Sequence, residues 1–109
     1  MPFKDRLNII SIIESIEKIF EYTKGYEDAD QFYQNSRDFD AVLMNFIIIG
    51  EMVNRLSEEF LEDQRQINWS KIRGFRNIVA HDYFGIDAEE VWDIIQNHLP
   101  PFLIELKNL

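Results

Sequence analysis

The apolar residues of this chain recur every three or four positions along most of its length. The longest such series lies between residues 37 and 60 and consists of Phe39, Val42, Leu43, Phe46, Ile49, Val53, Leu56 and Phe60. This spacing places apolar side chains on one side of an α-helix, whereas a strand would alternate apolar and polar residues. We therefore predict an all-α protein with a long helix from about Arg37 to Phe60.

The middle of that helix, "AVLMNFIII", is apolar nearly all the way round. A helix of this kind has little polar surface to present to water. It is either central to a bundle or packed against a second chain, and the sequence leaves both arrangements open.

Other helices are predicted on both sides of the long one. The spacing indicates a first helix over residues 3–23, with Lys24-Gly25 as its stop, because glycine accepts the left-handed conformation that ends many helices. A short helix in "EDADQFYQN" is expected to begin after Asp28 or Asp30, since aspartate is a preferred N-cap residue.

Two more helices are predicted in the second half of the chain. Residues 62–68 form a polar connection, after which Asn68 or Ser70 caps a helix. Asp87 and Glu90 open the last helix, which Pro100-Pro101 should kink or divide because proline has no N–H to donate. The whole predicts an antiparallel bundle of four to five helices, in a single domain over residues 1–109.

Composition excludes several classes of protein. The chain has 109 residues, 46% of them hydrophobic, so it can bury a core without disulfides, and it has no cysteine. Its start, "MPFKDRLNII", lacks the long apolar run of a signal peptide, and no apolar run is long enough to span a bilayer. We expect a soluble, cytoplasmic protein with no membrane partner.

Charge is unevenly distributed along the chain. The net charge is -9, from 11 basic and 20 acidic residues, yet no acidic residue lies between Asp63 and Asp82. This acid-free segment contains four basic residues, Arg65, Lys71, Arg73 and Arg76. The segment is therefore electropositive and suited to an anion such as a phosphate, unless its charges pair with acidic neighbours.

The acid-free segment ends in the motif "RNIVAHDY", residues 76–83. On a regular helix Arg76 lies about 40° from Ile72, on the side expected to be buried. A buried arginine must pair with a carboxylate, such as that of Glu51, or line a cleft. His81 lies about 140° round the helix from Arg76, so the two side chains do not easily meet at one phosphate. Either the helix ends or bends near Ala80, or the arginine of one subunit meets the histidine of another.

An arginine and a histidine together suit the cleavage of RNA without a metal. Neutral imidazole can accept the proton of a ribose 2′-hydroxyl, imidazolium can protonate the leaving 5′-oxygen, and a guanidinium stabilises charge on the phosphate. Asn77 shares the face of His81 and can orient the imidazole or bind a phosphate oxygen, or it is a surface residue. Tyr83 is by default a half-buried structural tyrosine, but on a continuing helix it would lie on the Arg76 side, where its hydroxyl could bond the same ligand. Asp82 either orients the histidine or finishes the helix.

The arrangement of Arg76, Asn77, His81 and Tyr83 resembles the R-x4-H-x-Y motif of HepT-like toxins in the HEPN superfamily. The similarity extends to Ile49-Gly50-Glu51 in the long helix, to "INWSKIRGFRN" before the motif, and to "VWDIIQNHLP" near the end. The resemblance implies a helical homodimer with a metal-independent ribonuclease site in the cleft between protomers. Arg76 and His81 would be catalytic, with Asn77 as a supporting residue.

The resemblance also implies a partner. Such toxins are encoded with a minimal nucleotidyltransferase antitoxin that transfers AMP to the tyrosine of the motif, here Tyr83. An adenylate beside the cleft would block RNA and repel its phosphates. The family likeness places Glu51 near the motif, where pairing with an arginine is favoured over a catalytic role.

Two other functions remain as alternatives. A non-catalytic HEPN module would bind a nucleotide or a nucleotidyltransferase partner without cutting RNA. A histidine metal site is disfavoured because the chain has only His81 and His98, without a further ligand at helical spacing. We therefore expect no metal and no cofactor.

Overall fold

The computed structural model describes residues 1–81 and 85–109, leaving aside the side chains of Ala80 and His81. Its elements are α1 (Phe3–Thr23), α2 (Ala29–Gln34), α3 (Ser36–Asn54), α4 (Glu58–Asp63), α5 (Trp69–His81), α6 (Ala88–Asp93), a π-helical segment η2 (Ile94–His98) and α7 (Leu99–Lys107). No strand occurs in the described residues. The prediction of an all-α fold is confirmed.

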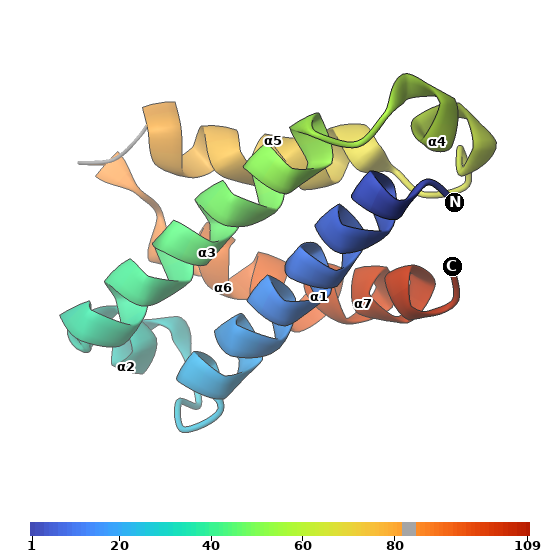
Figure 1. Cartoon of the computed structure of the whole chain (residues 1–109). Coiled ribbons are helices and arrows are strands. Elements are labelled where there is room, and N and C mark those ends of the chain that lie inside the picture. Colours follow the sequence, from blue (N-terminus) through green and yellow to red (C-terminus); the bar gives the residue numbers. More distant parts are fainter. Residues whose placement is uncertain (82–84) are drawn as a thin grey trace.

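Helix α3 lies between α1 and α5 and packs on both, running antiparallel to each (Figure 1). Helix α7 packs against α1, while the short α2 contacts α3 and α6. This is the predicted helical bundle. Helix α3 makes the two most extensive helix–helix contacts in it, one with α1 and one with α5. None of the helices described is long and apolar enough to cross a membrane.

The apolar middle of α3 divides between core and surface. Val42, Phe46, Ile49 and Val53 are completely buried. On the opposite side of the same helix, Met44 is 56% exposed, and Ile47, Ile48 and Met52 are half-buried. The helix is therefore central to the bundle, as one of the two expectations had it, but it also presents an apolar strip to the surface.

The predicted continuation of the long helix to Phe60 is wrong, because α3 ends at Asn54 and α4 begins at Glu58. The break is held by Asp5 of α1, which is 1% exposed. Its carboxylate accepts hydrogen bonds from the Ser57 backbone N–H at 2.8 Å and from the Ser57 hydroxyl at 2.7 Å. The Ser57 hydroxyl in turn accepts from the Phe60 N–H at 3.2 Å and so caps α4.

The predicted ends of the other helices are mostly confirmed. The side chains of Asp28, Asn68 and Asp87 accept backbone hydrogen bonds from the first turns of α2, α5 and α6. The first helix ends where predicted, but not by the predicted mechanism, since no described glycine has a positive φ. The Thr23 hydroxyl instead donates to the Ile19 carbonyl at 2.8 Å within the last turn.

The last helix is interrupted as Pro100-Pro101 predicted. Proline has no N–H, so neither residue can donate the α-helical hydrogen bond to the preceding turn. The turn before the prolines is the π-helical segment η2, in which the Leu99 N–H donates to the Ile94 carbonyl, five residues back. The helix is thus divided into α6 and α7 by one wide turn.

Candidate functional site

Helices α3 and α5 approach each other closely at Gly50 and Arg76. A Cβ atom on Gly50 would lie 2.5 Å from Cβ of Arg76, a distance that real Cβ atoms do not show. Glycine at this position therefore lets the two backbones come together. The contact fixes the position of Arg76, the first residue of the motif, relative to α3.

Arg76 forms an ion pair with Glu51, the residue after Gly50 on α3. Arg76 Nε lies 2.6 Å from Glu51 Oε1, and the two side chains are 41% and 42% exposed. The predicted pairing of Glu51 with an arginine of the motif is present. The predicted burial of Arg76 is only partial, because its side chain extends from the packed side of α5 towards solvent.

A half-exposed ion pair adds little to folding, about 0–1 kcal/mol. Its main effect here is to hold one guanidinium in one place at the surface. A guanidinium has five N–H donors. The carboxylate at Nε leaves the two terminal nitrogens as donors for another anion.

The rest of the motif is described only in part. Helix α5 includes His81 and ends there, one residue after Ala80, so the helix end predicted near Ala80 is present. Position 81 therefore lies about 140° round the helix from position 76. Asn77 is exposed. The His81 side chain, Asp82 and Tyr83 lie outside the described residues, so their predicted roles stay predictions.

The basic residues of the acid-free segment do not form one patch. Arg65 lies 3.9 Å from Glu62, and Lys71 Nζ lies 2.8 Å from His98 Nδ1. Lys71 is about 140° round α5 from Arg76, whereas Arg73 is only about 60° from it. Arg73 and Arg76 are thus the two basic residues that share one side of the helix.

A second polar cluster, which the sequence did not predict, joins α5 to η2. An ammonium only donates, so His98 Nδ1 accepts from Lys71, and the N–H of the ring then lies at Nε2, which donates to Asp93 Oδ2 at 3.2 Å. Hydrogen bonds from Asn97, at 2.6 Å, and from His98 hold the pKa of Asp93 below its ordinary value, against partial desolvation. Asp93 and His98 are five residues apart and would diverge on an α-helix, so the π-helical turn brings them together.

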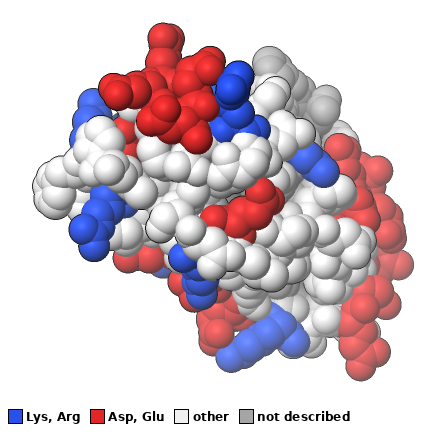
Figure 2. Space-filling model, turned by 90° about the vertical axis from the view of Figure 1, so that its right-hand side faces the viewer, with Lys and Arg blue, Asp and Glu red and all other residues white. Residues whose placement is uncertain are grey.

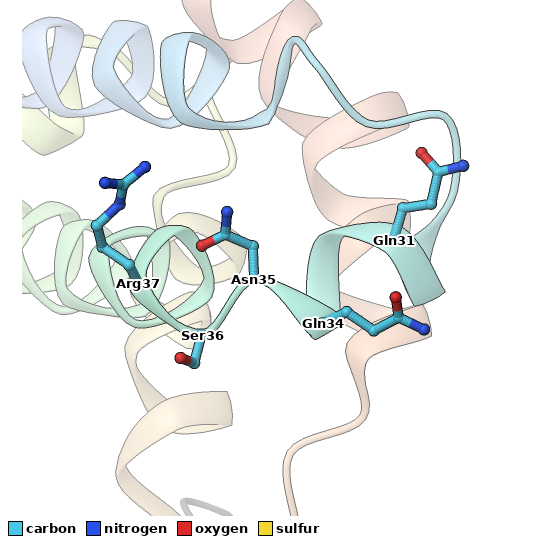
Figure 3. A pocket seen from close by; sticks show the side chains of 5 residues that line it. All are labelled: Gln31, Gln34, Asn35, Ser36 and Arg37. Carbon is cyan, nitrogen blue, oxygen red and sulfur yellow. The ribbon is translucent and has the colours of Figure 1, made fainter.

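Outside the motif, the described side chains form a polar surface hollow but no metal site. Among the described side chains, no group of three His, Asp or Glu residues is placed to hold a metal ion. A surface hollow between α2 and α3 is lined by five polar residues, Gln31, Gln34, Asn35, Ser36 and Arg37 (Figure 3). Their side chains point in different directions, and Asn35 is already used to cap α3. The hollow has no convergent polar groups and is not assigned a function.

Arg76 and His81 lie five residues apart on one helix of a helical bundle, as the resemblance to HepT-like proteins of the HEPN superfamily predicted. The chain belongs to the HepT-like ribonuclease family, because residues 12–109 match the family described as "Ribonuclease HepT-like". This confirms the resemblance on which the site was predicted.

Named relatives agree with this assignment. A Methanocaldococcus jannaschii protein named as a candidate RNase is 32% identical over 110 residues, which cover 100% of this chain and 90% of the relative. A second M. jannaschii protein with the same kind of name is 32% identical, over 91% of this chain and 90% of its own. A Thermococcus cleftensis protein named "Probable ribonuclease HepT" is 29% identical, over 82% of this chain and 80% of the relative. No solved structure gives a significant match.

Proposed function

We propose that this protein is a metal-independent ribonuclease toxin of a type II toxin–antitoxin pair. It acts in the cytoplasm as a homodimer of a single HEPN domain over residues 1–109. Its antitoxin is a minimal nucleotidyltransferase that transfers AMP to Tyr83. Family membership supports the reaction class, and the relatives are named as ribonucleases.

The observation that carries the proposal is the half-exposed Arg76, held by Glu51 at the crossing of α3 and α5. A guanidinium fixed at the surface, five residues before a histidine on the same helix, offers a phosphate both charge and directed N–H groups. Asn77, exposed between them in the chain, is a supporting donor.

The chemistry follows from these groups. The ribose 2′-hydroxyl attacks the adjacent phosphorus while a neutral His81 accepts its proton, and the bond to the 5′-oxygen breaks. A second, protonated His81 gives its proton to that oxygen, so a cyclic phosphate and a 5′-hydroxyl remain. Arg76 stabilises the extra negative charge on the phosphate oxygens in the transition state.

The need for two histidines, one as acid and one as base, favours a site made by two protomers. The 140° separation of positions 76 and 81 on a continuous helix points the same way. The apolar strip of α3, with Met44 exposed and Ile48 half-buried, runs along the same helix as Glu51 and offers a surface for the partner.

Modification of Tyr83 would explain how such a toxin is silenced. The tyrosine is two residues after His81, so an adenylate there adds bulk and negative charge next to the cleft. RNA phosphates would then be repelled and excluded. The proposed nucleotidyltransferase carries out the reaction: the Tyr83 oxygen loses its proton and bonds to the α-phosphorus of ATP, and pyrophosphate leaves.

Two experiments test the proposal. In the first, wild type, His81→Ala and Arg76→Ala are each expressed in a bacterial host. In the second, the purified proteins are incubated with RNA in the presence of a metal chelator. Wild type should arrest growth and give 5′-hydroxyl products, and both variants should fold but lose both effects. Co-expression with the nucleotidyltransferase should restore growth and add one AMP by intact mass, except in Tyr83→Phe. Cleavage that survives both substitutions would refute the proposal, and tight nucleotide or partner binding without cleavage would identify a non-catalytic module.

A further inference from the structure

Arg73 lies one helical turn before Arg76 on α5. Residues three apart on a helix are neighbours, with Cβ atoms about 5–6 Å apart. Lys71, the other cation at this end of α5, faces His98 on the far side of the helix. Arg73 is therefore the basic side chain on α5 that accompanies Arg76, and the reaction proposed above gives it no role.

The surroundings of Arg73 differ from those of Arg76. The residue is half-buried, and its Nε atom is fully buried without a hydrogen-bond partner in the described part of the chain. Arg76 by contrast has the Glu51 carboxylate at 2.6 Å. Burial of a charged N–H without a partner costs free energy, and arginines usually avoid it by extending into water. Because Nε is out of reach of a ligand, only the terminal nitrogens of this half-buried guanidinium can bind a phosphate beside the proposed site.

We infer that Arg73 is a second phosphate-binding residue of this site, which holds the RNA phosphate next to the one that is cleaved. The inference rests on the proposed ribonuclease function. Two guanidiniums one turn apart match two successive phosphates of a single strand better than they match one phosphate. Arg76 is already neutralised by Glu51, so Arg73 supplies the net attraction for the strand, while Arg76 acts on the reacting phosphate.

This division of roles has a kinetic consequence. Loss of Arg73 removes one phosphate contact from the bound strand in both the ground state and the transition state. KM for RNA therefore rises while kcat changes little. Loss of Arg76 lowers kcat instead, because its contact strengthens as charge develops on the phosphate.

The test uses Arg73→Met, which keeps the apolar stem of the side chain and removes the guanidinium. Arg65→Met is the matched control, since Arg65 is 81% exposed, lies before α5 and loses the same charge. Binding is measured with a single-stranded 2′-O-methyl RNA, which cannot be cleaved, over a range of salt concentrations. Cleavage kinetics and thermal unfolding are measured on the same proteins.

For Arg73→Met we expect binding weaker by about tenfold and a slope of log K against log salt shallower by about 0.7, the value for one phosphate contact on a single strand. The melting temperature should stay the same or rise, because an unpaired buried N–H is removed. Arg65→Met should bind with the wild-type salt slope.

Two results would overturn the inference. One is a wild-type salt slope and affinity in Arg73→Met. The other is a lowered melting temperature that accounts for weaker binding, which would make Arg73 a structural residue. A different result would refute the proposed ribonuclease activity alone. In that case the wild-type protein binds the 2′-O-methyl strand through Arg73 but does not cleave RNA, so the reaction is ruled out and the role of Arg73 in binding stands.

Discussion

Glu51 has two possible roles at the proposed site, and the two roles predict different results for one substitution. Its carboxylate contacts Arg76 Nε at 2.6 Å and is 42% exposed. As a positioning residue it keeps the guanidinium aimed at the phosphate. As an acid or base it would itself exchange a proton with RNA.

For Glu51→Gln we expect kcat to fall by about tenfold, because the charged anchor of the arginine is reduced to a neutral hydrogen bond while the proton-transfer groups remain. The free energy of unfolding should change by about 1 kcal/mol or less, since a half-exposed pair contributes little. The check is a pH–rate profile beside an unfolding curve. A profile that keeps both limbs supports positioning, and loss of one limb would make Glu51 a proton-transfer group.

At the level of single residues, the sequence allowed the Glu51–Arg76 pair to be predicted, because both residues belong to a family pattern and an arginine among apolar residues needs a partner. It did not allow the burial of Arg73 Nε or the pairing of Lys71 with His98 to be predicted. Both depend on which helix packs against each side of α5. Helical spacing gives the side, but not the neighbour.

The crossing of α3 and α5 is the element-scale feature on which the site depends. Alanine in place of Gly50 would favour the helix itself by about 1 kcal/mol. Its Cβ, however, would meet Cβ of Arg76 at 2.5 Å, an atom attached directly to the backbone that cannot swing away. The helices must then separate, and Arg76 moves relative to Glu51.

We expect Gly50→Ala to lower the free energy of unfolding by about 1–3 kcal/mol and to reduce cleavage. Gly74→Ala is the control, because a Cβ on Gly74, in α5 itself, meets nothing within 4 Å. That variant should keep activity and gain up to about 1 kcal/mol. Chemical denaturation and cleavage assays compare the two, and equal effects of both substitutions would contradict a special role for the crossing.

Helix boundaries were predictable where the signal is local. Asp28, Asn68 and Asp87 cap the helices that follow them, within three residues of chain. The break between α3 and α4 was missed because the acceptor that holds Ser57 is 52 residues away, on α1. Apolar spacing through Leu56 and Phe60 continued across the break, so the pattern alone favoured one long helix.

For the whole molecule, charge limits where a polyanion can bind. Figure 2 shows one face on which acidic side chains gather in clusters and basic ones form smaller, separate patches. With a net charge of -9, such a surface repels RNA at a distance. Under the proposed function, contact with RNA would therefore be confined to the few phosphates that Arg73 and Arg76 can bind.

The proposed dimer makes a prediction at the same scale. Met44 is 56% exposed on the apolar strip of α3, so Met44→Glu places a charge in the proposed interface. We expect the dimer to dissociate and cleavage to be lost, with helical content unchanged. Ile104→Glu, at an apolar residue of α7 that is 63% exposed, should keep the dimer.

Sedimentation and circular dichroism decide between these outcomes. A dimer that survives Met44→Glu would remove α3 from the interface. Dissociation by Ile104→Glu alone would move the interface to α7.

The buried Asp5 bears on how far this chain can be shortened. The family match begins at residue 12, which suggests a start for a trimmed protein. Trimming there would remove Asp5, and with it the acceptor for Ser57, together with Asn8, whose amide donates to the Arg55 carbonyl at 3.3 Å. The turn that leads through α4 into the helix carrying Arg73 and Arg76 would lose its anchor. A shortened protein should therefore keep the first turn of α1, which lies ahead of the stretch that matches the family.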